Sequence, residues 1–531
     1  MRDRDRLLVG GRIRNPGSPV VTSCLGISGG RIVGLGDEVQ VRANLRSDPE
    51  VVPLGGATVL PGFVEAHAHL RAYSLARRRL DLSRSTSPED AAEAVARVAA
   101  TRPPGAWIQG RGWNKNRWPG QTFPDRRVLD HAAPGHPVAL WSHDGHILWL
   151  NRRALEALGY WGEVPRGDGG EFVVDPATGE PTGIATERMA DLARERLPEP
   201  GPDEVERAAR EGLASLAALG IVALHNFEGI ERLPLWSGLE ASGELSLRLL
   251  LHFAADELDE ALSLGLVTGF GSDRLRLGAV KVYLDGALTG QTAHLLDPYE
   301  PPGAGRGVEV TRAGDFDDVV ARAQAGGISV SVHAIGDAAN RVALDAYERH
   351  PSPPRIPLAP RIEHAQILHP ADVPRFGRLG VVASVQPCHL FEDMPTADRY
   401  LGERAGRSEP LASLLETGAR LAFGSDAPIE HPDPRRGLYA AIARRRPDGW
   451  PGEGGWHPRE RLGIEAALEA YTLGGAIAGG TGHRQGRIEV GRDADLVVLG
   501  EDPARVDPES ILDISVLRTI VGGDDTYVRE T

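Results

Sequence analysis

Cysteine, lysine and long apolar runs are all scarce in this sequence of 531 residues. Its two cysteines, Cys24 and Cys388, lie far apart and form no CxxC pair, which excludes a disulfide framework. No apolar run is long enough to span a bilayer, and the first residues include no apolar segment of the kind found in secretory signals. These absences predict a protein of the reducing cytoplasm without a membrane partner.

Basic residues are also in the minority, since the formal net charge at pH 7 is −15. An acidic chain argues against nucleic acid as a partner and against a basic membrane-binding face. With 41% hydrophobic and 25% charged residues, the composition is that of a globular protein with ample material for a core. We therefore expect a small-molecule substrate, and we expect a homodimer because two-fold dimers are the commonest assemblies.

The scarcity of lysine draws attention to the two positions where it occurs. Lys115 and Lys281 are the only lysines among the 59 Lys and Arg residues, so the chain otherwise uses arginine. Lys281 lies inside the apolar run "GAVKVYLDGALTG". One interpretation is a buried lysine that forms an ion pair or shifts its pKa. The other is an amine that must react, which a permanently protonated guanidinium cannot do.

Short β-type runs with tight turns occupy both ends of the chain. "LLVGGRI" and "GRIVGLG" lie near the start, and "GRIEVGRDADLVVL" and "VLRTIVGGDDTYV" lie near the end. A segment too long to be a structureless loop follows the motif "EAHAHL", which indicates an inserted subdomain. The predicted domains are a β-sandwich from residues 1–60 and 481–531, a barrel from residues 61–70 and 204–480, and an inserted α/β subdomain from residues 71–203.

Eight strand-like segments alternate with helical segments in the middle of the chain. The strand candidates are "TVLPGFVEAHAHL", "GIVALHNF", "LSLRLLLHF", "LGAVKVYLDG", "GGISVSVHAIGD", "APRIEHAQI", "GVVASVQPC" and "RLAFGSDAPI". This alternation is typical of a parallel α/β fold, and eight strands close a TIM-type (β/α)8 barrel. No glycine-rich nucleotide-binding turn follows the first strand, which argues against a doubly wound open sheet.

Side chains that bind metals recur where five of these strands end. They are His67 and His69 on the first strand, Lys281 on the fourth, His333 on the fifth, His364 on the sixth and Asp426 on the eighth. Singly, each histidine has an ordinary explanation as a core residue, and Asp426 has one as a helix cap. In a barrel, however, the carboxyl ends of the strands meet on one face. Four imidazoles and a carboxylate there predict a site for a borderline divalent ion such as zinc.

The motifs that carry these residues resemble those of a known family. "LPGFVEAHAHL", "VKVYLDGAL", "VHAIGD", "RIEHAQ", "GSDAPI" and "GRIEVGRDADLVVL" are similar to motifs of the amidohydrolase superfamily of metal-dependent hydrolases. "GWNKNRWPG", "DGHILWLN", "GEPTG" and "IVGG" resemble those of its YtcJ-like branch (amidohydrolase family 3), which includes N-substituted formamide deformylases. The resemblance implies a (β/α)8 barrel, a flanking β-sandwich and a centre with one or two metals.

The resemblance also implies roles for the ligands. His67, His69 and Asp426 would bind one metal, His333 and His364 a second, and Lys281 would bridge both after its amine has reacted with carbon dioxide. A metal-activated hydroxide would then attack the substrate, with Asp426 as the catalytic residue that moves the proton. The implied reaction is hydrolysis of a non-peptide C–N bond in an amide, formamide, carbamate or related group.

Two alternatives to this function remain open on the residues alone. A mononuclear deaminase of a ring substrate is one, although such enzymes usually have a glutamate where this chain has Gly336, and they lack a lysine at the position of Lys281. A non-catalytic regulatory protein on the same scaffold is the other, because a fold does not by itself imply a function.

Several further residues are weaker candidates. Glu65 stands where the family usually has aspartate, and it would support the region around His67. The loop 444–458 is a candidate lid, and His225 is equally consistent with core or site. The candidates for substrate binding in the inserted segment are Trp113, His143, Asp144 and His146, although Trp113 and Trp118 are also typical packing anchors and the other three could stabilise a local turn. Asp285 and Asp337 are expected to position loops.

Overall fold

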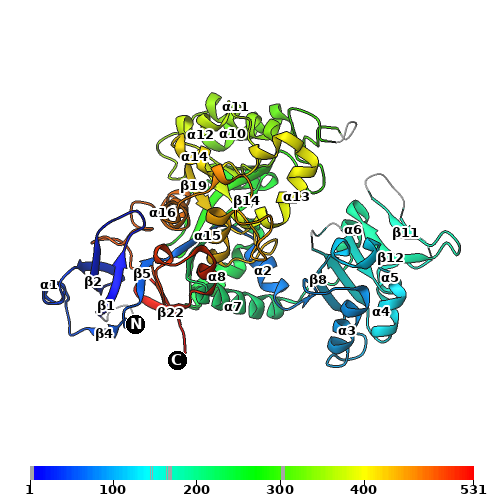
Figure 1. Ribbon diagram of the computed structural model, residues 1–531, viewed down its shortest axis with the longest axis horizontal. Coiled ribbons are helices and arrows are strands. Elements are labelled where there is room, and N and C mark those ends of the chain that lie inside the picture. Colours follow the sequence, from blue (N-terminus) through cyan, green and yellow to red (C-terminus); the bar gives the residue numbers. More distant parts are fainter. Residues whose placement is uncertain are drawn as a thin grey trace. The chain divides into compact units, whose positions relative to one another are not determined.

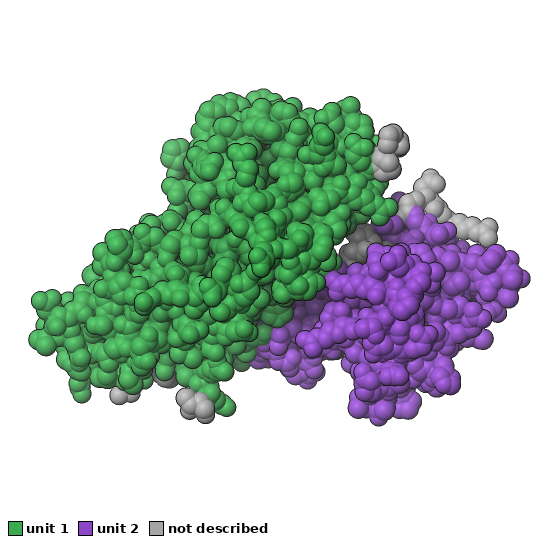
Figure 2. All heavy atoms as spheres, in the orientation of Figure 1, with its two compact units in different colours: residues 1–70, 213–531 green, residues 71–212 purple. Residues whose placement is uncertain are grey.

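The computed structural model describes residues 5–143, 145, 147–162, 164–165, 170–300 and 305–530. The chain forms two compact units, of which the first contains residues 1–70 and 213–531 and the second contains residues 71–212 (Figure 2). Figure 1 labels their helices and strands along the chain. The domain boundaries expected from the sequence stay predictions.

A sheet of eight parallel strands forms the centre of the first unit. In order around the sheet they are β19 (Arg420–Phe423), β18 (Val382–Val385), β17 (Arg361–His364), β16 (Val330–Ala334), β15 (Leu275–Tyr283), β14 (Arg248–Ala254), β13 (Ile221–Asn226) and β6 (Phe63–Ala68). Beyond the end of β19, Asp426 N donates to His67 O over 2.7 Å, and His69 N donates to Ala427 O over 2.7 Å. These bonds bring the first and last strands together, so the predicted eight-stranded parallel barrel is confirmed as a nearly closed one.

Helices connect consecutive barrel strands, as a parallel sheet requires. From β13 to β19 the connecting helices in the described part of the chain are α8 (Leu233–Ala241), α9 (Leu258–Ser263), α10 (Ala313–Ala325), α11 (Asp337–Arg349), α12 (Val373–Leu379), α13 (Leu390–Leu401) and α14 (Leu411–Glu416). After β19 follow α15 (Pro434–Ala443), α16 (Ile464–Glu469) and α17 (Gly475–Ala478), which lead to the terminal sheet. Ala339, Ala343 and Tyr347 of α11 recur at helical spacing and are buried. The Tyr347 hydroxyl donates to main-chain carbonyls of β16 and β17, which fixes this helix against the barrel.

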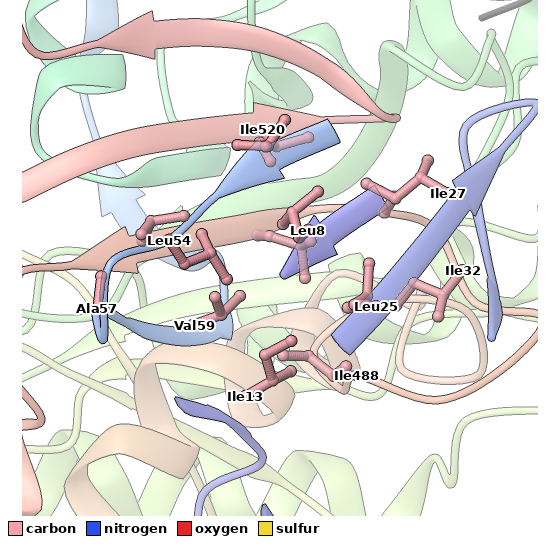
Figure 3. Close-up of a cluster of buried hydrophobic side chains, with 14 residues drawn as sticks. Leu8, Ile13, Leu25, Ile27, Ile32, Leu54, Ala57, Val59, Ile488 and Ile520 are labelled. Atoms are coloured by element: carbon pink, nitrogen blue, oxygen red, sulfur yellow. The ribbon is translucent and has the colours of Figure 1, made fainter. Parts of the chain in front are cut away.

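The two terminal segments share one mixed sheet of eight strands. They are β1 (Arg6–Arg14), β2 (Val21–Ser28), β3 (Arg31–Leu35), β4 (Glu50–Pro53) and β5 (Thr58–Pro61), with β20 (Leu496–Leu499), β21 (Val516–Val521) and β22 (Asp524–Val528). β5 and β20 pair antiparallel and so join the N-terminal and C-terminal strands; α1 (Glu38–Ala43) packs beside β2 and β3. Figure 3 shows Leu8, Leu25, Val59 and Ile520 in the core that both segments bury together.

A buried ion pair attaches this terminal sheet to the barrel. The Arg248 guanidinium on β14 donates two hydrogen bonds, of 2.7 and 3.0 Å, to the carboxylate of Asp495, which directly precedes β20. Both side chains are almost fully buried. Bidentate pairs of this kind are geometrically specific. The pair therefore fixes the position of the start of β20 against β14.

The second unit has its own sheet and core. Its strands, in sheet order, are β11 (Phe172–Val174), β12 (Pro181–Thr186), β10 (Ile147–Leu150), β9 (Val138–Ser142), β8 (Ile108–Trp113) and β7 (Leu80–Asp81). Its helices include α3 (Pro88–Ala99), α4 (Arg126–Ala132), α5 (Arg152–Leu158) and α6 (Glu187–Arg194), and α2 (Leu70–Ala76) and α7 (Pro202–Ala218) lie at its boundaries. In the described part of the chain, no helix has the length and hydropathy of a membrane span.

Candidate metal centre

Three of the predicted ligands, His67, His69 and Asp426, meet where the barrel closes. His67 belongs to β6, His69 follows it directly, and Asp426 follows β19. The Asp426 Oδ1 atom lies 3.2 Å from Nε2 of His69 and 3.5 Å from Nε2 of His67. One potential ligand atom from each residue lies within 4.8 Å of the other two. This spacing is compatible with a single ion bound by all three.

His333 and His364 lie next to this group. Their ring centroids are 4.5 Å apart, and the ring centroid of His364 is 5.2 Å from that of His67. His333 is on β16 and its Nε2 donates to Gly286 O over 3.1 Å. His364 is the last residue of β17. The two strands therefore place both imidazoles at the same end of the barrel as the first three ligands.

Lys281 on β15 reaches the same place from inside the barrel. Its Nζ lies 4.7 Å from the ring centroid of Phe227, which follows β13 and stacks on His67 with 4.1 Å between centroids. Burial lowers the pKa of Lys281 to about 8, although the carboxylates of Glu363 and Asp426 oppose that shift. About a tenth of the amine is therefore neutral and nucleophilic at pH 7.

Two of the predicted ligands have backbones in the left-handed region. The φ angle is 73° at His364 and 57° at Asp426, a conformation that costs a residue with a side chain about 1–3 kcal/mol. On a regular strand, Glu363 and His364 would point to opposite faces. Instead both approach His67, through a hydrogen bond and a ring contact respectively. The unusual backbone thus brings two consecutive side chains into one site.

Glu363, which the sequence motifs did not indicate, accepts a hydrogen bond from the imidazole of His67. Its Oε2 lies 2.7 Å from His67 Nδ1, and Arg361 and Ser331 also donate to its buried carboxylate. Burial alone would raise the pKa of Glu363, but Arg361 and His67 outweigh it and hold that pKa well below its usual range. Since an ionised carboxylate only accepts, His67 Nδ1 carries the proton and Nε2 keeps its lone pair for a metal.

Glu363→Gln is expected to weaken metal binding by about 10- to 100-fold, because the ring of His67 loses its anionic anchor. Competition titration against a chelator would measure the metal affinity, with circular dichroism to verify folding. Ser384→Ala is the matched control, since Ser384 accepts a 2.7 Å bond from Arg361 in the same network without touching His67. Equal loss of metal affinity in both variants would show that Glu363 has only a structural role.

Glu65 has a different task from that of Glu363. Its Oε1 accepts from the backbone N–H groups of His67 (3.0 Å) and Ser425 (2.9 Å), so it joins β6 to the segment after β19. A Cβ atom on Gly424 would lie 2.6 Å from Glu65 Oε1 and 2.6 Å from His67 N. The longer acid at position 65 therefore supports the backbone beneath the site, in space that glycine at position 424 leaves open.

The charges at the site suit metal coordination. Burial, aided by the charge of Lys281, lowers the pKa of His67 to about 4 and that of His333 to about 3. Burial would raise the pKa of Asp426, but His67 and His69 hold it well below its usual range. Neutral imidazoles, as at His67 and His333, and an ionised carboxylate are the forms that bind a cation. Burial would lower the pKa of His69 as well, but Asp426 outweighs it and raises that pKa.

Two buried polar atoms test whether these residues fit a metal. In the described part of the chain, Asp426 Oδ1 and His364 Nδ1 are buried and have no hydrogen-bond partner. Buried polar atoms of this kind are uncommon and call for an explanation such as an ion or a water. Binding of a divalent cation at each of these atoms would satisfy it, so the donor set fits the metal centre expected from the sequence.

Of the four substrate-binding residues predicted in the second unit, the structure describes Trp113 and His143. Trp113 is fully enclosed in a hydrophobic core together with Trp118, and its indole N–H donates to a main-chain carbonyl. This placement does not support a substrate contact for Trp113, because no part of the ring is exposed. His143 is partly buried, and its backbone N–H donates to Trp113 O. Asp144 and His146 lie outside the described residues.

Other polar residues around the barrel have structural contacts. His225 accepts a 2.8 Å bond from the arginine of β17 and belongs to the buried network behind His67. Asp285 accepts three backbone N–H groups at 2.7–3.0 Å, and Asp337 accepts one at 2.8 Å. Bonds from backbone N–H groups to a carboxylate fix the path of a loop, as expected for Asp285 and Asp337. His389, which follows β18 and was not singled out, stacks on His364 with 5.9 Å between centroids.

A barrel with metal-binding side chains at the carboxyl ends of its strands is the architecture of metal-dependent (β/α)8 hydrolases. The amidohydrolase family matches residues 50–527, which is most of the sequence. The chain therefore belongs to the amidohydrolase family, as the sequence motifs predicted.

Relatives and solved structures agree with this assignment. YtcJ of Bacillus subtilis (strain 168), named as an amidohydrolase, is 30% identical over 516 residues, covering 95% of this chain and 96% of that protein. N-substituted formamide deformylase of Arthrobacter pascens is 29% identical over 520 residues, covering 95% and 94%. The crystal structure of an uncharacterized metal-dependent hydrolase from Pyrococcus horikoshii OT3 superposes with a TM-score of 0.81 at 28% identity, covering 95% of this chain and 99% of the other.

Proposed function

We propose that this protein is a metal-dependent hydrolase of non-peptide C–N bonds in a small-molecule substrate, such as an amide, formamide or carbamate. The observation that carries the proposal is the convergence of four imidazoles, a lysine and a carboxylate at one end of the barrel, with Asp426 Oδ1 and His364 Nδ1 buried and unpaired among the described residues. Similarity to an N-substituted formamide deformylase supports the choice of bond.

The proposed ligand set divides into two groups. His67, His69 and Asp426 would hold one divalent ion, most suitably zinc given the nitrogen-rich donors. His333 and His364 would hold a second, with Lys281 between them as a carbamate. When bound, such an ion lowers the pKa of water and polarises a carbonyl group.

Asp426 would be the residue that moves the proton. Its carboxylate is ionised, and its Oδ1 has no hydrogen-bond donor among the described residues. It would therefore accept a proton from the attacking water and pass it to the leaving nitrogen. His69 Nε2 lies 3.2 Å from that oxygen, a spacing that suits binding of one ion by both atoms.

Position 336 argues for hydrolysis of this kind over ring deamination. The deaminase alternative calls for a glutamate there, but Gly336 N donates to Asp285, and a Cβ atom at position 336 would lie 2.0 Å from His294 O. A glutamate would therefore require the backbone to move. The homodimer, the cytoplasmic location and the absence of a nucleic-acid partner stay predictions from the sequence.

The proposal is tested by assaying metal-reconstituted protein on panels of N-formyl, N-acyl and carbamate compounds. We expect release of an amine from at least one class, loss of that activity on chelation, and its recovery on adding zinc. No hydrolysis of any panel by fully metal-loaded protein would contradict the proposal. Activity that survives complete removal of the metal would contradict it as well.

A further inference from the structure

Arginines gather on one side of the sheet in the second unit. Arg79 directly precedes β7. Arg111 lies on β8, and the residue paired with it on the neighbouring strand β9 is Trp141. Arg194, the last residue of α6, places its guanidinium 4.3 Å from the ring centroid of Trp141. The charges of Arg71, Arg111 and Arg194 all act on Arg79. We call these four residues, Arg71, Arg79, Arg111 and Arg194, the arginine cluster.

Arg79 differs from its neighbours in having no counter-ion in contact. Among the described residues its side chain makes no hydrogen bond or salt bridge, whereas the Arg71 side chain pairs with Glu199 over 3.0 Å and that of Arg194 donates to Gly145 O. Burial, followed by the charges of its three arginine neighbours, lowers the pKa of Arg79. A guanidinium nevertheless stays protonated in proteins. The charge at Arg79 is therefore opposed only at a distance, by Glu199.

The Arg79 side chain lines a cavity in the same unit. The cavity has a volume of about 270 Å³, and its polar and aromatic lining consists of Arg78, Arg79, Arg102, Trp107, Gln109, Glu199 and Glu204. The Glu199 side chain is 80% exposed, so its charge is largely screened by solvent. The cavity thus combines guanidinium donors, a side-chain amide and an aromatic wall, and its size suits a small molecule.

We propose that this cavity binds the oxyanion group, carboxylate or phosphate, of a small molecule, with Arg79 as its principal contact. A guanidinium fork matches the geometry of either group through paired hydrogen bonds. The formal charge of −15 on the whole chain disfavours large polyanions and leaves a small anion as the natural ligand. The inference goes beyond the proposed hydrolase function, since all the cavity residues belong to the second unit and none is a candidate metal ligand.

The test is calorimetric titration of the full-length protein with inorganic phosphate and, separately, with succinate. Sodium chloride holds the ionic strength constant, so that general screening does not contribute to the difference. We expect saturable binding of at least one anion to the wild type and at least tenfold weaker binding to Arg79→Gln. Arg97→Gln, which alters an exposed arginine of α3 in the same unit, is the matched control and should bind as the wild type does. The anion that binds more tightly distinguishes the carboxylate source from the phosphate source.

Thermal unfolding provides a second readout that does not depend on activity. Without anion, Arg79→Gln should melt at the same temperature as the wild type or higher, because it removes a charge that its neighbours repel. Phosphate or succinate should stabilise the wild type and not the variant. Equal anion binding by wild type and Arg79→Gln, no binding to either, or binding that disappears on metal chelation would overturn the proposal.

Discussion

Asp426→Asn is expected to reduce kcat for the C–N substrate by about 10³-fold, because the variant loses the group that accepts and returns the proton. Asparagine keeps the shape of the side chain but supplies a neutral oxygen next to His67 and His69 in place of an ionised one. Metal affinity should therefore fall together with kcat. Steady-state kinetics at saturating zinc, with metal content measured on the same samples, separates the two effects.

Asp48→Asn is the matched control for this experiment, since Asp48 is an exposed aspartate in the terminal segment, outside the barrel. Circular dichroism and melting curves would establish that both variants are folded. An Asp426→Asn enzyme that bound zinc normally and kept the wild-type kcat would remove Asp426 from both roles. A fall in kcat that persisted when zinc binding had been fully restored would assign the proton transfer to Asp426 separately from its role as ligand.

The barrel could be predicted because two independent features of the sequence mark its strands. Each is a short apolar run, and several end in a polar residue that an interior strand would not otherwise contain. His67, Lys281 and His333 lie on their strands in the structure, as that pattern requires. The order of the strands around the barrel then follows from the parallel connections alone.

The support around the ligands could not be predicted in the same way. Strand alternation assigns Glu363 and His364 to opposite faces, and only the positive φ angle at His364 brings both to His67. The one available signal was the charged pair Arg361 and Glu363 at alternating positions of a buried strand, "RIEH". Trp113 illustrates a different difficulty. It was a candidate for substrate binding, but sequence alone does not distinguish a tryptophan in a core from one in a binding site.

Both the rarity of lysine in the chain and the chemistry of the site predict a reactive amine at Lys281. Its Nζ lies 4.7 Å from the Phe227 ring centroid and 4.9 Å from that of Tyr283, which stabilise the ammonium form. Burial, however, brings the pKa of Lys281 down to about 8. The neutral amine would attack carbon dioxide, forming an N–C bond and releasing one proton, and the carbamate would carry one negative charge shared by two oxygens. Native mass spectrometry of the intact, zinc-loaded protein in bicarbonate should show the added mass of one carbon dioxide, and the same measurement on Lys281→Arg should not.

Lys281→Arg should lose at least a hundredfold in activity, because a guanidinium is always protonated and cannot form the carbamate. Lys281→Ala should be equally impaired, but added acetate or propionate should restore part of its activity by placing a carboxylate where the carbamate stood. Lys115→Arg is the natural control, since it alters the only other lysine of the chain and should leave activity unchanged. A bare amine in zinc-loaded, bicarbonate-equilibrated protein, together with full activity in Lys281→Arg, would reduce Lys281 to a buried cation held by Phe227 and Tyr283. Rescue of Lys281→Ala by a carboxylate, with none from an alkylamine, would instead show that this position supplies anionic oxygens.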